Sequence, residues 1–226
     1  MRPESPQSSL TGSALVGWLA REALLQGPAE PTSFVDGLGR WLGWKEAIPL
    51  AAALHAPPSA AAGSSPGGVA ATRSVAATSA VEREFDRVRA TLTRAIENDR
   101  SLAADTDFPP YRRHIAGLQQ TMAAAIGTLR AQARAAVARR SPAMSRLAAL
   151  DAVIDEVVGA HEHTLLAMMP SLLERHFTRL AQAADGDWPA AFRQDLRRAL
   201  RAELALRLQP TQGLLDALRT DTPRDP

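Results

Sequence analysis

Hydrophobic side chains recur every three or four residues through most of the second half of the chain, the spacing of one face of an α-helix. The clearest stripe alternates steps of four and three, and predicts one rod of roughly 40 Å. Asp107, followed by Pro109 and Pro110, marks the start of this helix. The stripe consists of Tyr111, Ile115, Leu118, Met122, Ala125 or Ile126, Leu129, Ala133 and Ala136.

The preceding helix is predicted to open at Ser79, because Ser79 with Glu82 three residues later matches a capping box. Its stripe is Val81, Phe85, Val88, Leu92 and Ile96. The following helix is predicted to open with Ser141 as N-cap and Pro142 as the first helical residue. Its expected stripe is Leu147, Leu150, Ile154, Val157, His161 and Leu165.

In the rest of the chain, proline residues are expected to interrupt or end helices. Pro170 is expected to kink or break the third long helix. Beyond it the stripe continues through Leu172, Leu173, Phe177 and Leu180. Asp187 is expected to cap a fourth helix, which Gln209 and Pro210 stop. That helix carries Trp188, Phe192, Leu196, Leu200 and Leu204, and a short helix over 213–219 follows it.

These elements define the fold class. No strand pattern occurs, and the connections between the long helices are short, so that sequential helices should be neighbours. A hydrophobic spacing between 3.5 and 3.6 favours helices crossing at about 20°. We therefore predict an all-α protein, with an antiparallel up-and-down helical bundle or coiled coil over residues 79–219.

The first third of the chain is organised differently. Residues 1–9 and the tail 220–226 are polar, and 1–9 should be disordered. Residues 10–54 should form a small helical module, and the Gly, Pro and Ser content of 55–78 indicates a flexible linker. The module holds Trp18, Trp41 and Trp44. These tryptophans either form its miniature core or present an aromatic face that docks a partner.

Composition excludes several function classes. The chain has no cysteine, which removes disulfides, thiolate nucleophiles and Cys-based metal sites. Charged and small residues break any apolar run near the N-terminus, so no signal peptide is expected there. The longest uncharged stretch, 47–72, contains too much Pro, Gly and Ser to span a membrane. The cytoplasm is the expected location.

Candidate chemistry is sparse. His161 and His163 are two residues apart and point to different sides of a helix, so they cannot both bind one metal ion. Asp151 and Asp155 share a helix face, and the simplest interpretation is that arginines of the preceding helix neutralise them. No serine lies in a nucleophile-elbow context, and no glycine-rich loop matches a phosphate-binding loop. The sequence predicts no enzyme, no catalytic or metal-binding residue, and no cofactor.

The strongest anomaly in charge is a stretch from Phe108 to Leu150. It holds seven arginines and no acidic residue, whereas 82–107 and 151–174 are rich in acids. A basic helix between acidic ones is typical of a bundle that neutralises its own charges. The same arginines could instead bind phosphates of nucleic acid or anionic lipid, or an acidic protein. Nucleic acid is disfavoured, because aromatic readers are missing. The candidate contacts are Arg130, Arg134, Arg139 and Arg140.

Several blocks of the sequence resemble an uncharacterised bacterial family, catalogued only as a domain of unknown function. They include a Trp-Leu-Gly-Trp block at 41–44 and a Leu-Gln-Pro block at 208–210. Together the blocks cover 9–20, 39–49, 107–113, 143–153, 172–177 and 206–219. The resemblance implies no activity or cofactor. It implies a cytoplasmic accessory to a membrane assembly, because members of the family are encoded near OmpA-like and motor-stator-like envelope proteins.

These observations favour a non-enzymatic scaffold or adaptor that makes helix-mediated contacts. The expected partner is another helical protein, a membrane-attached protein or a second copy, and the chain itself should not span a membrane. The alternative is a phosphate-binding protein that uses the basic helix over 111–140.

Overall fold

The structure is a computed structural model that describes residues 48, 51–52, 67–99, 102, 106–183 and 187–221, with the backbone alone at 67–75 and 161. The described part is helical and contains no strand, so the all-α prediction is confirmed. Its long helices are α4 (Gly67–Glu97), α5 (Phe108–Ala138), α6 (Pro142–Ala167), α7 (Met169–Ala183) and α8 (Trp188–Thr220).

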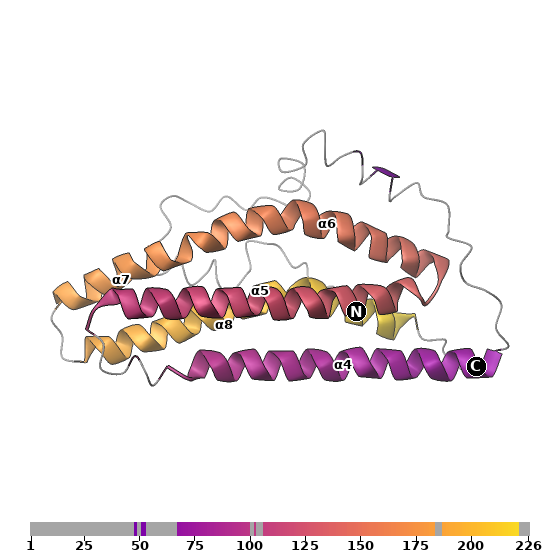
Figure 1. Cartoon of the computed structure of the whole chain (residues 1–226), viewed down its shortest axis with the longest axis horizontal. Coiled ribbons are helices and arrows are strands. Elements are labelled where there is room, and N and C mark those ends of the chain that lie inside the picture. Colours follow the sequence, from indigo (N-terminus) through magenta and orange to yellow (C-terminus); the bar gives the residue numbers. More distant parts are fainter. Residues whose placement is uncertain are drawn as a thin grey trace, which may run out of the picture.

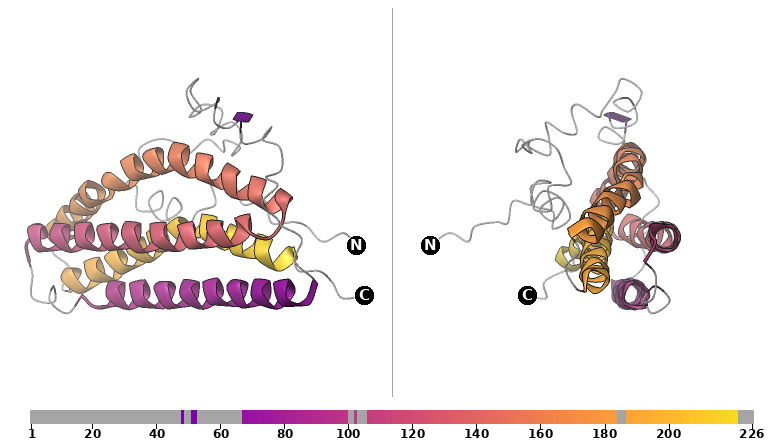
Figure 2. Two further views of the ribbon diagram at one scale, coloured as in Figure 1. Left: turned by 45° about the vertical axis from the view of Figure 1, so that its right-hand side comes forward. Right: turned by 90° about the vertical axis from the view of Figure 1, so that its left-hand side faces the viewer.

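The helices lie lengthwise beside one another and alternate in direction (Figure 1). Helix α5 packs against α4, α6 and α8, and α4 packs against α8 (Figures 1 and 2). Helices α6 and α7 follow each other as one bent rod. The choice between a helical bundle and a coiled coil stays a prediction. Among the described helices, none combines the length and apolarity needed to cross a bilayer.

The stripe expected on α5 is confirmed. Every predicted position is buried, and Ile126 rather than Ala125 fills the position that the sequence left open. Because α5 contacts α4, α6 and α8, its buried side chains lie at the centre of the hydrophobic core. Ser141 caps α6 as predicted, because its side chain accepts a hydrogen bond of 3.2 Å from the backbone N–H of Met144.

Aromatic side chains gather at one end of the molecule, where α5 and α8 begin beside α7. The Phe177 and Phe192 rings meet edge to face at a centroid distance of 5.0 Å, and Tyr111 meets Phe192 at 5.1 Å. Phe108 and Trp188 complete the group. The Tyr111 hydroxyl donates a 3.1 Å hydrogen bond to the carbonyl of Leu102. Of the aromatic residues that the structure describes, all but Phe85 therefore lie in one cluster.

The helix expected to open at Ser79 begins at Gly67 instead, so residues 67–78 of the expected linker are helical. Glycine, proline and serine dominate only the first part of that linker. From Val69 to Ala80 alanine is the commonest residue and glycine and proline are absent, and alanine has the highest helix propensity. Ser79 therefore lies inside α4 and caps nothing.

Pro170 breaks the third rod as predicted: α6 ends at Ala167, and Pro170 lies in the first turn of α7, where proline is tolerated. The prediction for Pro210 was wrong, because α8 continues through it to Thr220. Leu208, Leu214 and Leu215 flank Pro210 and are buried in the core. Packing of these side chains outweighs the missing hydrogen bond.

The stripe expected on α6 is confirmed at Val157, which is buried, but not over its whole length. Leu147, Leu150 and Ile154 are only partly buried, and Leu165 is exposed. The side chain of His161 lies outside the described residues. Helix α6 instead turns Ala148, Leu166 and a row of acidic residues towards its neighbours. Arginines on α5 cause this rotation, since burying them without carboxylates would cost more than exposing part of several apolar side chains.

Candidate functional site

The most prominent polar feature of the described helices is a charge network between α5 and α6. Arg130 and Arg134 are four residues apart on α5, and Asp151 and Asp155 are four residues apart on α6, so each pair shares one helix face. Arg130 reaches Asp151 at 2.7 Å and Asp155 at 2.5 Å. Arg134 reaches the same two carboxylates at 2.9 Å and 2.7 Å. The interpretation that arginines of the preceding helix neutralise these acids is confirmed.

Burial differs across this network. The side chain of Asp151 is 12% exposed and that of Asp155 is 41% exposed. Desolvation alone would lower the pKa of Arg134, but its hydrogen bonds to Asp155 and Asp151 outweigh burial, and the pKa is raised. The Arg134 guanidinium therefore remains charged, and carboxylates of the same chain hold the guanidinium groups of both Arg130 and Arg134.

A second network lies beside the first and joins α5, α6 and α8. Glu203 on α8 is 0% exposed. Its carboxylate accepts hydrogen bonds from Arg207 at 2.8 Å and from the amide of Gln119 at 3.1 Å. Gln119 also donates to the carbonyl of Leu166, at 3.1 Å. Arg207 makes a further ion pair with Glu162 of α6, at 3.5 Å. Three helices thus meet at one buried polar position.

Sequence reasoning missed this second network, although a signal was present. Glu203 is three residues beyond Leu200 and directly precedes Leu204, so it occupies a position on the apolar stripe of α8. A glutamate at such a position is buried, and a buried carboxylate needs a cationic partner. Arg207, one turn further along, is the nearest candidate.

Burial raises the pKa of Glu162, and Arg207 and Arg130 only partly oppose it. The unfolded chain therefore loses this proton first, from about pH 4.5 upward, and the contribution of Glu162 to the free energy of unfolding falls as pH rises through that window. We expect Glu162→Gln to remove this slope, so that the variant gains stability relative to the native chain as pH rises above about 4.5. Urea unfolding at a series of pH values measures it. Glu156→Gln, exposed on the same helix, should leave the slope unchanged.

His176 is a buried histidine on α7. Arg179 lies 2.8 Å from its Nδ1, and Asp195 of α8 lies 2.9 Å from its Nε2. A guanidinium can only donate, so Nδ1 accepts and Nε2 carries the hydrogen that Asp195 receives. The ring lies against Phe192, with 6.0 Å between centroids. This arrangement joins α7 to α8. His163 is exposed, and no metal-binding group of three or more His, Asp or Glu residues occurs in the described part of the chain.

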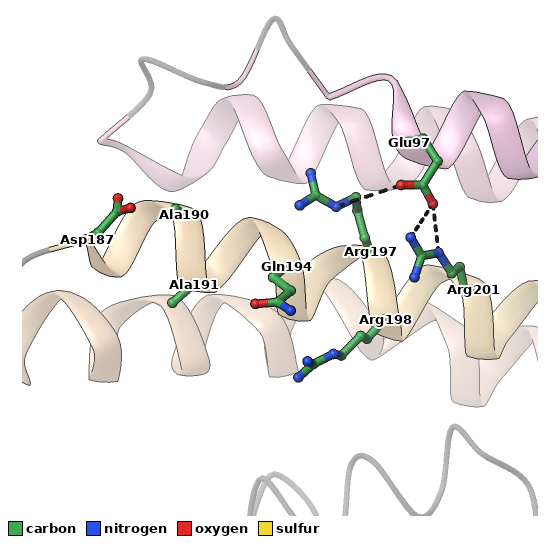
Figure 3. Close-up of a pocket in the computed structure, with 8 residues that line it drawn as sticks. All are labelled: Glu97, Asp187, Ala190, Ala191, Gln194, Arg197, Arg198 and Arg201. Carbon is green, nitrogen blue, oxygen red and sulfur yellow. Dashed lines mark hydrogen bonds and ion pairs between the residues drawn. The ribbon is translucent and has the colours of Figure 1, made fainter.

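An open polar depression of about 610 Å³ lies between the end of α4 and the first half of α8 (Figure 3). Its three arginines are already paired: Arg198 bonds Asp195 on its own helix at 3.3 Å, whereas Arg201 bonds Glu97 at 2.5 Å and Arg197 bonds Asp99 at 2.6 Å. The last two ion pairs tie α4 to α8 across the depression. Its lining consists of Glu97, Asp187, Ala190, Ala191, Gln194, Arg197, Arg198 and Arg201.

The four arginines proposed as phosphate contacts do not form one surface. Arg130 and Arg134 are bonded to Asp151 and Asp155. Arg140 donates to the carbonyl of Leu218 at 3.1 Å, which ties the end of α5 to the end of α8. Arg139 is exposed. The three proposed docking tryptophans, Trp18, Trp41 and Trp44, lie outside the described residues.

The chain matches one known protein family over almost its whole length. The family model described as "Protein of unknown function (DUF3348)" matches residues 1–220. The chain belongs to the DUF3348 family. The resemblance inferred from the sequence is thereby confirmed at the level of an uncharacterised family. None of the curated proteins and none of the solved structures matches this DUF3348 protein.

Proposed function

We propose that this DUF3348 protein is a non-enzymatic scaffold or adaptor of the cytoplasm. It makes helix-mediated contacts with another helical protein, as an accessory to a cell-envelope assembly. The ionisable side chains described above support this proposal, because they are used to hold helices together. Arg130, Arg134 and Arg207 each bind carboxylates across a helix boundary.

The observation that carries the proposal is the apolar surface where α6 meets α7. Leu165 and Met168 are at least half exposed, and they are the only large hydrophobic residues besides Ile48 that stay exposed in the described part. They are three residues apart at the end of α6, so their side chains are neighbours on the surface. Leucine beside a flexible methionine suits the apolar face of an amphipathic partner helix.

The ion pairs of α5 weigh against the alternative of phosphate binding. Its central residues, Arg130 and Arg134, have their guanidinium groups bonded to Asp151 and Asp155. A phosphate would have to displace two carboxylates that are already in place.

The proposal predicts that partner binding depends on the α6–α7 junction. The full chain, immobilised and incubated with a detergent extract of native membranes, should retain a helical protein identified by mass spectrometry. We expect Leu165→Glu with Met168→Gln to abolish retention, because charge at the contact must be desolvated. Ala160→Glu, at an exposed position of the same helix, is the matched control and should retain the partner.

Two results would contradict the proposal. One is a strict monomer by light scattering that retains no protein from the extract. The other is a partner that binds the Leu165→Glu, Met168→Gln variant as well as it binds the native chain.

A further inference from the structure

Helix α6 presents its apolar stripe away from α5. The hydrogen bonds from Arg130 and Arg134 fix the side of α6 that faces α5, since they end on Asp151 and Asp155. Successive residues of a helix are turned by about 100°, so Val157 lies about 160° around the helix from Asp155. Leu150 and Ile154 lie on the Val157 side. These three residues are called the outer stripe of α6 below.

The outer stripe is nevertheless covered. Val157 is 6% exposed, and Leu150 and Ile154 are half-buried. Val157 does not belong to the continuous hydrophobic core that α4, α5, α7 and α8 share with α6. Helix α6 packs on α5 through its other side, which carries Asp151 and Asp155. The burial of Val157 therefore calls for a second layer of side chains on the outer stripe.

We propose that residues 10–54 of the same chain dock on the outer stripe of α6. The spacing of Leu15, Trp18 and Leu19 predicts an amphipathic helix in this segment, and Trp41 and Leu42 predict a second one. Such helices need an apolar surface on which to bury their hydrophobic faces, because a segment of this size cannot build a large core by itself. The outer stripe offers that surface.

The connection between the two parts is long enough. Helix α4 starts at Gly67, at the end of the molecule where α6 also starts (Figure 1). The hydrogen bond from Arg140 to Leu218 joins the residues just after α5 to the end of α8, and the salt bridge between Glu82 and Arg219 joins that end of α8 to the middle of α4. Helices that pack at about 10 Å place α6 roughly 20 Å from α4, across α5. The residues between 54 and Gly67 can span up to about 40 Å.

The family match supports an occupant from the same chain. One family model covers residues 1–220, which includes both the 10–54 segment and all five long helices. An outer stripe and a segment that covers it would form one unit and occur together. This inference does not depend on the proposed partner, whose contact is at Leu165 and Met168.

Photo-crosslinking tests the inference on the full chain. Ile154 is replaced with p-benzoylphenylalanine, and the dilute protein is irradiated, separated by size and digested. We expect crosslinks from position 154 to peptides of residues 10–54 within the monomer band. Glu156, on the same helix but outside the outer stripe, receives the same photoreactive residue as the matched control and should give no such crosslink.

Each other outcome overturns the inference. Crosslinks confined to a dimer band would assign the stripe to a second copy of the chain. Crosslinks to α5 or α7 alone, or none at all, would leave residues 10–54 elsewhere. Equal yields from positions 154 and 156 would mean that the contact is nonspecific. A crosslinker at Leu165 reports the proposed partner separately, so that failure of one hypothesis is not failure of the other.

Tryptophan fluorescence gives a second measurement that needs no crosslinker. In a Trp188→Phe background, the three remaining tryptophans all lie in residues 10–54. We expect Ile154→Asp to shift their emission to longer wavelength, because a charge on the outer stripe displaces the segment into water. Ala149→Asp, at an exposed position of α6 outside the outer stripe, is the control and should leave the emission unchanged. An unchanged spectrum for Ile154→Asp would contradict the docking.

Discussion

Replacing Arg207 with methionine should lower the free energy of unfolding by about 3–5 kcal/mol, the cost of breaking a buried ion pair from one side. The cause is the partner left behind. Glu203 is 0% exposed, and Arg207 is its cationic partner at 2.8 Å. Gln119 would still donate one hydrogen bond to the carboxylate, but it carries no charge. Urea unfolding followed by circular dichroism measures the loss.

A double variant separates the ion pair from the shape of the side chain. Glu203→Gln combined with Arg207→Met removes both charges and keeps similar volumes, so most of the lost stability should return. Arg201→Met on the same helix is the matched control. Arg201 pairs with Glu97 at the exposed surface, where an ion pair contributes about 0–1 kcal/mol. If the double variant were no more stable than Arg207→Met, lost packing rather than an unpaired charge would be the cause.

Sequence periodicity predicted the helices that pack on several sides. The stripe of α5 was correct at every position, and that of α8 was correct up to Leu204. These helices bury apolar side chains against neighbours, so the hydrophobic pattern alone determines their orientation.

Helix α6 shows where that reasoning fails. It is apolar on several sides, and its stripe from Leu150 through Ile154 to Val157 is as regular as that of α5. Asp151 and Asp155 decide which side of α6 faces α5. The free-energy cost of leaving Arg130 and Arg134 without carboxylates exceeds the cost of a partly exposed leucine. The sequence predicts that arginines pair with Asp151 and Asp155, but hydrophobic spacing alone does not show that these ion pairs decide which side of α6 faces α5.

The start of α4 and the network around Glu203 illustrate two further limits. Composition taken over all of residues 55–78 concealed the alanine-rich second half, which is helical from Gly67. Glu203 does not appear among the expected features of α8, although its position on the apolar stripe of that helix requires burial. Local windows and the placement of each charge relative to the stripe carry information that overall composition does not.

Asp151 is the more buried of the two acids between α5 and α6. We expect Asp151→Asn to lower the free energy of unfolding by about 3 kcal/mol, because two largely buried guanidinium groups would then share only Asp155. Asp155→Asn should cost about 1 kcal/mol, since Asp155 is 41% exposed and water can replace part of its interaction. The two variants make the same chemical change in one network and differ in burial, so each is the matched control for the other.

The same pair of variants tests why the basic stretch on α5 is basic. If Asp151 and Asp155 neutralise Arg130 and Arg134, the native chain should elute from immobilised heparin at low salt. The double variant Asp151→Asn, Asp155→Asn should then be retained more strongly, and a rise in salt should reverse the difference. Circular dichroism of the double variant establishes that it is still helical. Strong retention of the native chain, equal to that of the double variant, would show that these arginines are already available to phosphate and would restore the phosphate-binding hypothesis.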